Sequence, residues 1–121
     1  MNITIRIVYS IVVNCNMSIT VVYEVHLDYD DLSLEAVEED VRRLMRLFNL
    51  HHAWIYMSSS GNHYHAFIRP PLAREEMLKV VAASKCHKEY KKRCRDWQEC
   101  AIRVRESLTK PKPVYVKSIT Q

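Results

Sequence analysis

The chain has 121 residues, of which 48% are hydrophobic and 26% are charged. This length suits a single domain, and this composition is typical of globular proteins, so the fibrous and disordered classes are excluded. The formal net charge is +4 at pH 7. A mildly basic domain of this size is compatible with nucleic acid as a partner, although its charge alone does not require one.

The beginning of the chain predicts no membrane segment. The apolar run of residues 3–13 is too short to cross a bilayer, contains Arg6 and lacks the features of a signal peptide. We therefore expect a soluble, cytoplasmic protein without a membrane partner. Met17 is a second candidate for the start of translation, so residues 1–16 are either an extension or an extra strand, and residues 17–121 form one domain. The four cysteines lack a C-x-x-C pair and are expected to be unpaired thiols, although a hyperthermophilic host would allow a disulfide. A zinc site at Cys86, His87, Cys94 and Cys100 is the alternative, but their spacing matches no common zinc signature.

The spacing of apolar residues predicts strands and helices in alternation. Segments that alternate apolar and polar residues indicate strands, and apolar residues three and four apart indicate amphipathic helices. The predicted strands are residues 19–28, 53–58, 63–69, which Pro70 and Pro71 end, 101–106 and 114–119. The predicted helices are residues 34–49, for which Ser33 is a suitable N-cap, 72–85 and 86–98.

This order of elements predicts an α+β fold. It follows the βαββαβ plan of ferredoxin-like and RRM-like domains, an antiparallel sheet with two helices on one face, plus a C-terminal strand. The other face of such a sheet is open and available for a functional site. The C-terminal strand lies at an edge in this plan, which offers one route to a homodimer.

Side chains alternate along a strand, so the sequence also predicts which of them reach the open face. Tyr23, Val25 and Leu27 are expected to face the helices. The outward set is then Glu24, His26, Asp28, Asp30, His63, His65, Arg103 and Arg105. Carboxylates beside imidazoles suit a divalent cation, magnesium or manganese, and arginines suit phosphate. A polar face is also ordinary for a half-exposed sheet, so the convergence of these groups is what indicates a site.

Two further segments add to this surface. The only glycine, Gly61, lies in a serine-rich turn directly before the two histidines, and such a turn can hold a phosphate or simply close a hairpin. The basic segment 85–95 contains Tyr90 and precedes Trp97, which is expected in the core. A basic helix of this kind either follows a nucleic-acid backbone or is a solvated helix face.

A strand that ends in Asp28-Tyr29-Asp30, followed by a helix and by the run Ser59-Ser60-Gly61-Asn62-His63-Tyr64-His65, resembles the catalytic core of archaeo-eukaryotic primases and primase-polymerases. The resemblance covers residues 20–106. It implies a role in DNA replication as a metal-dependent nucleotidyltransferase that acts on DNA and nucleotides. It also implies that Asp28 and Asp30 hold the cation and that His65, helped by Ser60, contacts the triphosphate. The family expects a third acid, for which Glu106 is the only candidate, on an apolar strand face.

The run His63-Tyr64-His65 also resembles the HUH endonucleases, the superfamily of replication initiators and relaxases. That resemblance implies a metal held by both histidines and a tyrosine nucleophile that nicks single-stranded DNA. Tyr90 is the candidate nucleophile. It is followed by Lys91, Lys92 and Arg93, but its helix precedes the fourth predicted strand instead of following the sheet.

Three functions therefore stay open on the sequence alone. Both enzyme hypotheses predict single-stranded DNA, a divalent cation and the same face of the sheet, with Lys91, Lys92, Arg93, Arg103 and Arg105 neutralising phosphates. The acidic end of the first strand favours the primase-like hypothesis slightly. A non-catalytic RRM-like module would need the open face and the basic helix but not the acids or the tyrosine. A replication-type site in so small a chain suggests a virus, a plasmid or an archaeal host.

Overall fold

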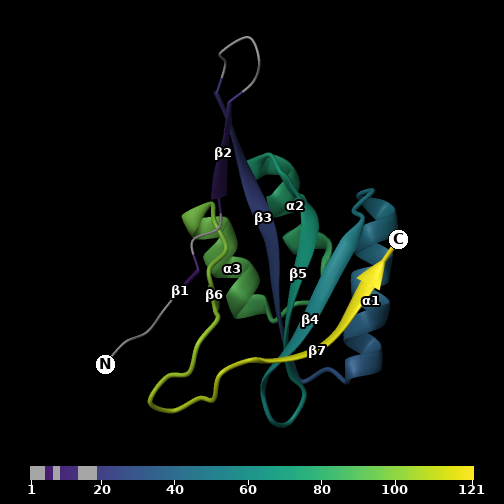
Figure 1. The fold of residues 1–121 in the computed structure, drawn as a ribbon, viewed down its shortest axis with the longest axis vertical. Coiled ribbons are helices and arrows are strands. Elements are labelled where there is room, and N and C mark those ends of the chain that lie inside the picture. The colour runs from purple at the N-terminus through teal and green to yellow at the C-terminus, as the bar shows by residue number, and fades with distance from the viewer. Residues whose placement is uncertain (1–4, 7–8, 14–18) are drawn as a thin grey trace.

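A computed structural model describes residues 5–6, 9–13 and 19–121. Within them the chain is α+β, with three helices behind an antiparallel sheet (Figure 1). The elements are β1 Ile5–Arg6, β2 Tyr9–Val13, β3 Ile19–Asp30, α1 Leu34–Leu47, β4 His52–Ser59, β5 His63–Leu72, α2 Arg74–Ala83, α3 Lys88–Trp97, β6 Ile102–Arg103 and β7 Val114–Thr120. Met17, the alternative start, lies outside the described residues. None of the helices in the described part is long and apolar enough to span a membrane.

The main sheet has the strand order β2-β3-β5-β4-β7, and every neighbouring pair is antiparallel. Val25 of β3 pairs with Ile68 of β5, and Ala66 of β5 pairs with Leu27 on one side and Ile55 on the other. Paired residues point to the same face of a sheet. These apolar rungs therefore form one continuous surface, which the helices cover.

The core lies between that surface and the helices. Val37, Val41 and Leu44 of α1 are spaced at helical intervals and are all fully buried. Ser33 caps the helix as predicted, because its Oγ accepts a hydrogen bond of 3.1 Å from the amide of Ala36. Helices α2 and α3 complete the core with the buried residues Met77, Val80, Val81, Tyr90 and Cys94.

The fourth strand of the ferredoxin-like plan does not join the main sheet. In place of a strand over residues 101–106, the two-residue β6 pairs with β1. The cause lies at the edge of β3, where β2 pairs with its first half and α3 covers the rest. The Tyr90 hydroxyl donates to the carbonyl of His26 at 2.6 Å, and the His87 amide donates to the carbonyl of Asp28 at 3.3 Å. The edges of the main sheet are β2 and β7.

Two smaller predictions were also wrong. Strand β5 does not end at Pro70 and Pro71 but continues to Leu72, which pairs with Tyr23 beyond a register shift in β3. A proline is tolerated where the ladder is interrupted, because it has no amide to donate there. Trp97, expected in the core, is 65% exposed at the end of α3.

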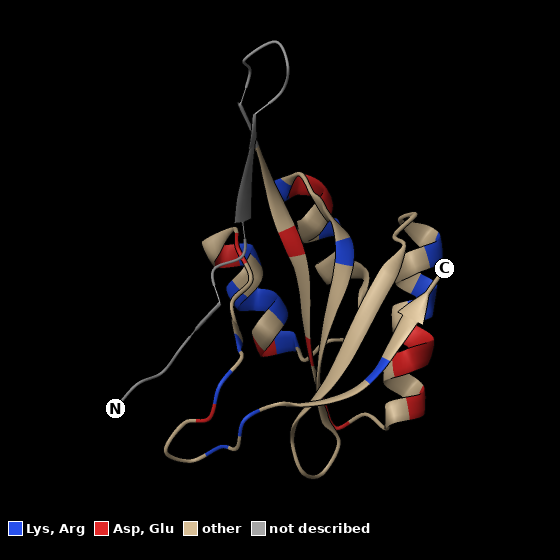
Figure 2. Cartoon of the chain, viewed as in Figure 1, with Lys and Arg blue, Asp and Glu red and all other residues tan. Residues whose placement is uncertain are grey.

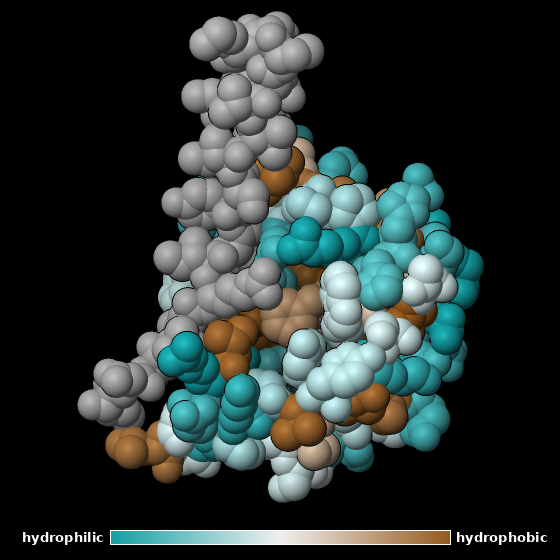
Figure 3. All heavy atoms as spheres, in the orientation of Figure 1, coloured by the Kyte–Doolittle hydropathy of each residue, from teal (hydrophilic) through white to brown (hydrophobic). Residues whose placement is uncertain are grey.

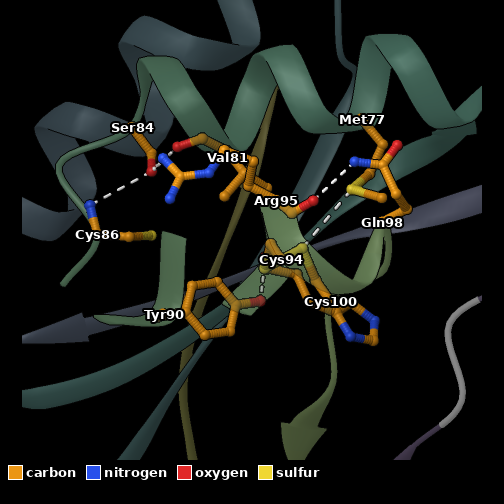
Figure 4. Close-up of a disulfide and its surroundings, with 10 residues drawn as sticks. Met77, Val81, Ser84, Cys86, Tyr90, Cys94, Arg95, Gln98 and Cys100 are labelled. Carbon is orange, nitrogen blue, oxygen red and sulfur yellow. Dashed lines mark hydrogen bonds between the residues drawn. A yellow bond between two sulfur atoms is a disulfide. The ribbon is translucent and has the colours of Figure 1, made fainter. Parts of the chain in front are cut away.

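A disulfide between Cys94 and Cys100 corrects the expectation of unpaired thiols (Figure 4). It joins α3 to the segment before β6, across a reversal at Gln98, whose φ is 59°. Cys100 also contacts the sulfur of Met77 at 3.7 Å. The bond holds α3 beside β6, and so places Arg93 and Arg103, one from each element, near the same end of β3.

Candidate functional site

Two acid–histidine pairs lie on alternate rungs of the β3–β5 ladder, with the Tyr29–Tyr64 rung between them. Asp28 is the partner of His65, and Asp30 is the partner of His63. All four side chains therefore point to the open face, as strand alternation predicted. The next pair on this face is His26 with Phe67, so the face is continuous with a more aromatic region.

The outer pair is a direct hydrogen-bonded contact near solvent. His63 Nδ1 lies 2.7 Å from Asp30 Oδ1, and each side chain is 33% exposed. At that exposure, solvent weakens the attraction between the two groups.

The inner pair is more buried and more widely separated. His65 Nε2 lies 3.5 Å from Asp28 Oδ1, and the side chains are 6% and 24% exposed. Burial, reinforced by the negative charge of Asp30, raises the pKa of Asp28 to about 6, against the opposing charges of Arg93, Lys110 and His87. Burial, followed by the charge of Arg103, lowers the pKa of His65 to about 4. At neutral pH the imidazole of His65 is therefore uncharged. The carboxylate of Asp28 is ionised, although burial makes its charged form unfavourable.

Three cationic side chains, Arg93, Arg103 and Lys110, line a hollow together with these pairs. Figure 2 shows a largely basic α3 and basic residues along residues 104–113, beside the acidic positions of β3. Together they enclose a hollow of about 210 Å³, lined by Asp28, Asp30, Ser58, Ser59, His63, His65, Arg93, Ala101, Ile102, Arg103 and Lys110. We call it the acid–histidine pocket. Cations beside carboxylates and the neutral imidazole of His65 suit a ligand that carries both phosphate and a divalent cation.

Arg103 is the best-anchored of these cations. Its guanidinium donates to the carbonyls of Ser58, at 2.5 Å, of Arg105, at 2.7 Å, and of Pro111. These contacts join β6 to the end of β4 and to the following loop, so they fix the wall of the pocket. Arg105, predicted to act beside it, is exposed outside the strand and does not line the pocket.

The glycine turn contributes differently from the prediction. Gly61 and Asn62 have φ values of 79° and 64°, so the turn needs residues that tolerate the left-handed region. Ser60 is exposed there, and the serines that line the pocket are Ser58 and Ser59.

Tyr90 is placed far from the role of a nucleophile. Its side chain is 2% exposed, and its hydroxyl donates to the His26 carbonyl at the edge of β3. Burial raises the pKa of the phenol well above its ordinary value. Of the three basic residues after it, Arg93 lines the pocket, whereas Lys91 donates to the Ala82 carbonyl and Lys92 pairs with Asp96.

A second, larger hollow adjoins the first on the same face. It has a volume of about 540 Å³ and is lined by Glu24, Val25, His26, Trp54, Tyr56, Phe67, Ile68, Arg69, Arg103, Val104, Lys112 and Pro113. We call it the aromatic groove. Over this face, side chains of hydrophilic and intermediate character gather around a more apolar centre (Figure 3). Trp54 and Tyr56 were missed from the sequence, although they alternate with the core residues Ala53 and Ile55.

The acid–histidine pocket offers oxygen ligands for a metal ion. Within the described residues, no three histidine, cysteine, aspartate or glutamate side chains form a group arranged to hold one. Two neighbouring carboxylates, Asp28 and Asp30, are nevertheless a sufficient protein contribution for magnesium, which is commonly bound by one or two carboxylates, water and substrate phosphates. His65 Nδ1 is buried and has no hydrogen-bond partner among the described residues.

Comparison with known proteins assigns no family to this chain. No protein-family model, no curated protein and no solved structure matches it.

Proposed function

We propose that this chain is a metal-dependent nucleotidyltransferase of DNA replication, similar to the catalytic core of primase-polymerases. The observation that carries the proposal is the acid–histidine pocket, which two carboxylates, two histidines and three cations line together. A deoxynucleoside triphosphate with its divalent cation has the complementary charges.

Each group in the pocket has a distinct task in this proposal. Asp28 and Asp30 hold magnesium or manganese, which when bound neutralises phosphate charge and activates a hydroxyl for attack. Arg93, Arg103 and Lys110 bind and orient the triphosphate. His65, neutral at pH 7, donates a hydrogen bond to a phosphate oxygen without adding charge.

The order of the central elements supports the same assignment. Strand β3, helix α1, strands β4 and β5, and helix α2 follow the split β-α-β plan, with β5 between β3 and β4. We therefore propose an RRM-like core whose usual last edge strand is replaced. The third acid of primase-like sites has no counterpart at Glu106, which is exposed and does not line the pocket, so Asp28 and Asp30 provide the carboxylates.

An HUH-type nicking endonuclease is the second candidate, favoured by His63 and His65 on one face of β5. Its weakness is the nucleophile, because the buried Tyr90 hydroxyl is already bonded to the main chain. An attack by this residue on DNA would require α3 to leave the edge of β3.

One denaturing gel separates these candidates. An end-labelled single strand, alone and annealed as a primer, is incubated with the protein, manganese and deoxynucleotides. We expect extended products that disappear when the cation is chelated. Shortened strands with label retained on the protein would replace the proposal with the endonuclease. Unchanged strands under conditions of measured binding would replace it with a non-catalytic module.

A further inference from the structure

The aromatic groove is not explained by the chemistry of the acid–histidine pocket. We propose that it stacks the unpaired bases of a single DNA strand next to that pocket. The inference rests on the proposed function, because it assigns the path of the strand on which the pocket acts. Three separate features carry it: the aromatic side chains, the surrounding charges and the wall that the two hollows share.

The aromatic side chains form a rigid, partly exposed surface. Trp54, Tyr56 and Phe67 come from two paired strands and are half-buried, so each ring is fixed by the sheet and still reaches the groove. Tyr56 meets Phe67 edge-to-face, with 5.4 Å between ring centroids and 84° between ring planes. His26 meets Phe67 in the same manner at 4.7 Å. Fixed rings lose little freedom when a base stacks on them.

The charges around the groove suit a strand with a phosphate backbone. Arg69, Arg103 and Lys112 line it, and the carboxylate of Glu24 is held by Arg69 at 2.8 Å and by His26 at 3.0 Å. The charge of Glu24 is therefore compensated, and Arg103 and Lys112 leave the lining of the groove with a positive charge. Aromatic rings with cations at their margin are the usual combination for single-stranded nucleic acid.

Continuity with the acid–histidine pocket indicates the direction of the strand. Arg103 lines both hollows, and its anchored guanidinium separates the carboxylates from the aromatic rings. A phosphate at Arg103 would therefore have its base on the aromatic side and its reacting end on the acidic side. Duplex DNA does not satisfy this arrangement, since its bases are already stacked on one another.

The two tryptophans allow a direct test. Trp54 lines the groove and Trp97 is exposed on α3, and the chain has no others. Trp97→Phe therefore leaves Trp54 as the only indole. Titration with a single strand of about ten thymidylates, within the usual range of site sizes, is expected to quench its fluorescence. An abasic strand of equal length carries the same phosphates and is expected to leave the emission unchanged.

A second variant keeps the test independent of the indole. Tyr56→Leu is expected to weaken binding of the thymidylate strand by about 5- to 150-fold at fixed salt, the usual value of one stacked base. It is expected to leave the affinity for the abasic strand unchanged, whereas a folding defect would weaken both. Equal affinity of wild type and Tyr56→Leu for the thymidylate strand would overturn the proposal. Unchanged Trp54 emission at saturation would do the same.

The outcomes also separate this inference from the proposed function. Quenching without primer extension would retain the groove and remove the nucleotidyltransferase. Extension without quenching would remove the groove alone. Quenching by a free deoxynucleoside triphosphate, with none by the strand, would overturn the assignment to DNA and make the groove a nucleotide site.

Discussion

The pairs Asp28–His65 and Asp30–His63 consist of the same residue types on alternate rungs of one sheet face, yet their surroundings differ. The outer pair is a 2.7 Å contact with both side chains one third exposed. The inner pair is 3.5 Å apart and largely buried. Burial raises the pKa of Asp28 and lowers the pKa of His65, which favours the neutral form of each. The outer pair closes the edge of the site, whereas the inner pair is poised for a ligand that would compensate its buried charge.

The difference shows that depth, rather than residue type, sets the chemistry of each rung. An exposed pair contributes about 0–1 kcal/mol to stability. A buried carboxylate beside a second one costs stability unless a cation is present. A site that binds a metal ion is expected to carry such a cost before its ligand arrives.

The largest effect is expected from removing the inner carboxylate. Asp28→Asn should lower the rate of primer extension by about a hundredfold or more, because it removes a proposed metal ligand. It should also raise the free energy of unfolding at pH 7 by about 1–2 kcal/mol, because the ionised group is disfavoured at this position. Extension assays and urea unfolding measure the two quantities.

Asp31→Asn is the matched control for this substitution. Asp31 is exposed in the following turn with a φ of 61°, which asparagine also tolerates. It should change neither quantity appreciably. A variant at Asp28 that loses stability, or that retains its full rate, would contradict the description of the inner pair.

The second effect concerns stability against pH. Because the pKa of His65 is lowered, the imidazole contributes stability that is fully present above pH 6.5 and is lost as the pH falls through about 4. Because the pKa of Asp28 is raised, the carboxyl group contributes stability that is fully present below pH 3.8 and is lost as the pH rises through about 6. The two slopes oppose each other in the wild type.

His65→Gln removes the first of these slopes. Between pH 4 and 6 the variant should therefore lose about 2 kcal/mol of stability relative to the wild type as the pH rises. Urea unfolding at several pH values measures this difference. Parallel curves for the two proteins would mean that the imidazole is not held neutral by burial.

Part of this comparison is predictable from sequence and part is not. Strand alternation is local, so the outward positions of Asp28, Asp30, His63 and His65 follow from the residues alone. Alternation does not say how deep each rung lies, since depth depends on the segments that cover it. Here the cover comes from residues after α3, whose path the sequence misassigned.

The same cause explains the other differences. The short β6 and the burial of Tyr90 arise because α3 covers the edge of β3, a tertiary arrangement without a local signal. Lys110 reaches the acid–histidine pocket from an irregular connection, which periodicity cannot place. The aromatic positions Trp54 and Tyr56, in contrast, carried an alternating pattern that could have been used.

A smaller effect is expected at Arg103, the cation that lines both the acid–histidine pocket and the aromatic groove. Arg103→Ala should weaken binding of single-stranded DNA about tenfold and reduce the salt dependence by about one counterion. Arg105→Ala removes an equal charge from an exposed position outside the pocket and should change the affinity less than about twofold. Equal effects at the two positions would show that only the net charge matters.

The smallest effect is expected at the outer rung. His63→Gln should change the free energy of unfolding by less than about 1 kcal/mol, because it removes a solvent-screened pair. Thermal or urea unfolding at pH 6 measures it. A loss several times larger would mean that the outer pair holds the turn together, and the contrast between the rungs would then fail.

The most direct test of the cation site is a titration of isotope-labelled protein with Mn²⁺, followed by NMR, since the paramagnetic ion broadens signals only near its binding site. We predict selective broadening of the amides of Asp28, Asp30, His63 and His65. The broadening should persist in Asp31→Asn and be absent in Asp28→Asn. Broadening centred elsewhere, or unchanged by the loss of the Asp28 carboxylate, would contradict the assignment of this pocket to a metal-dependent reaction.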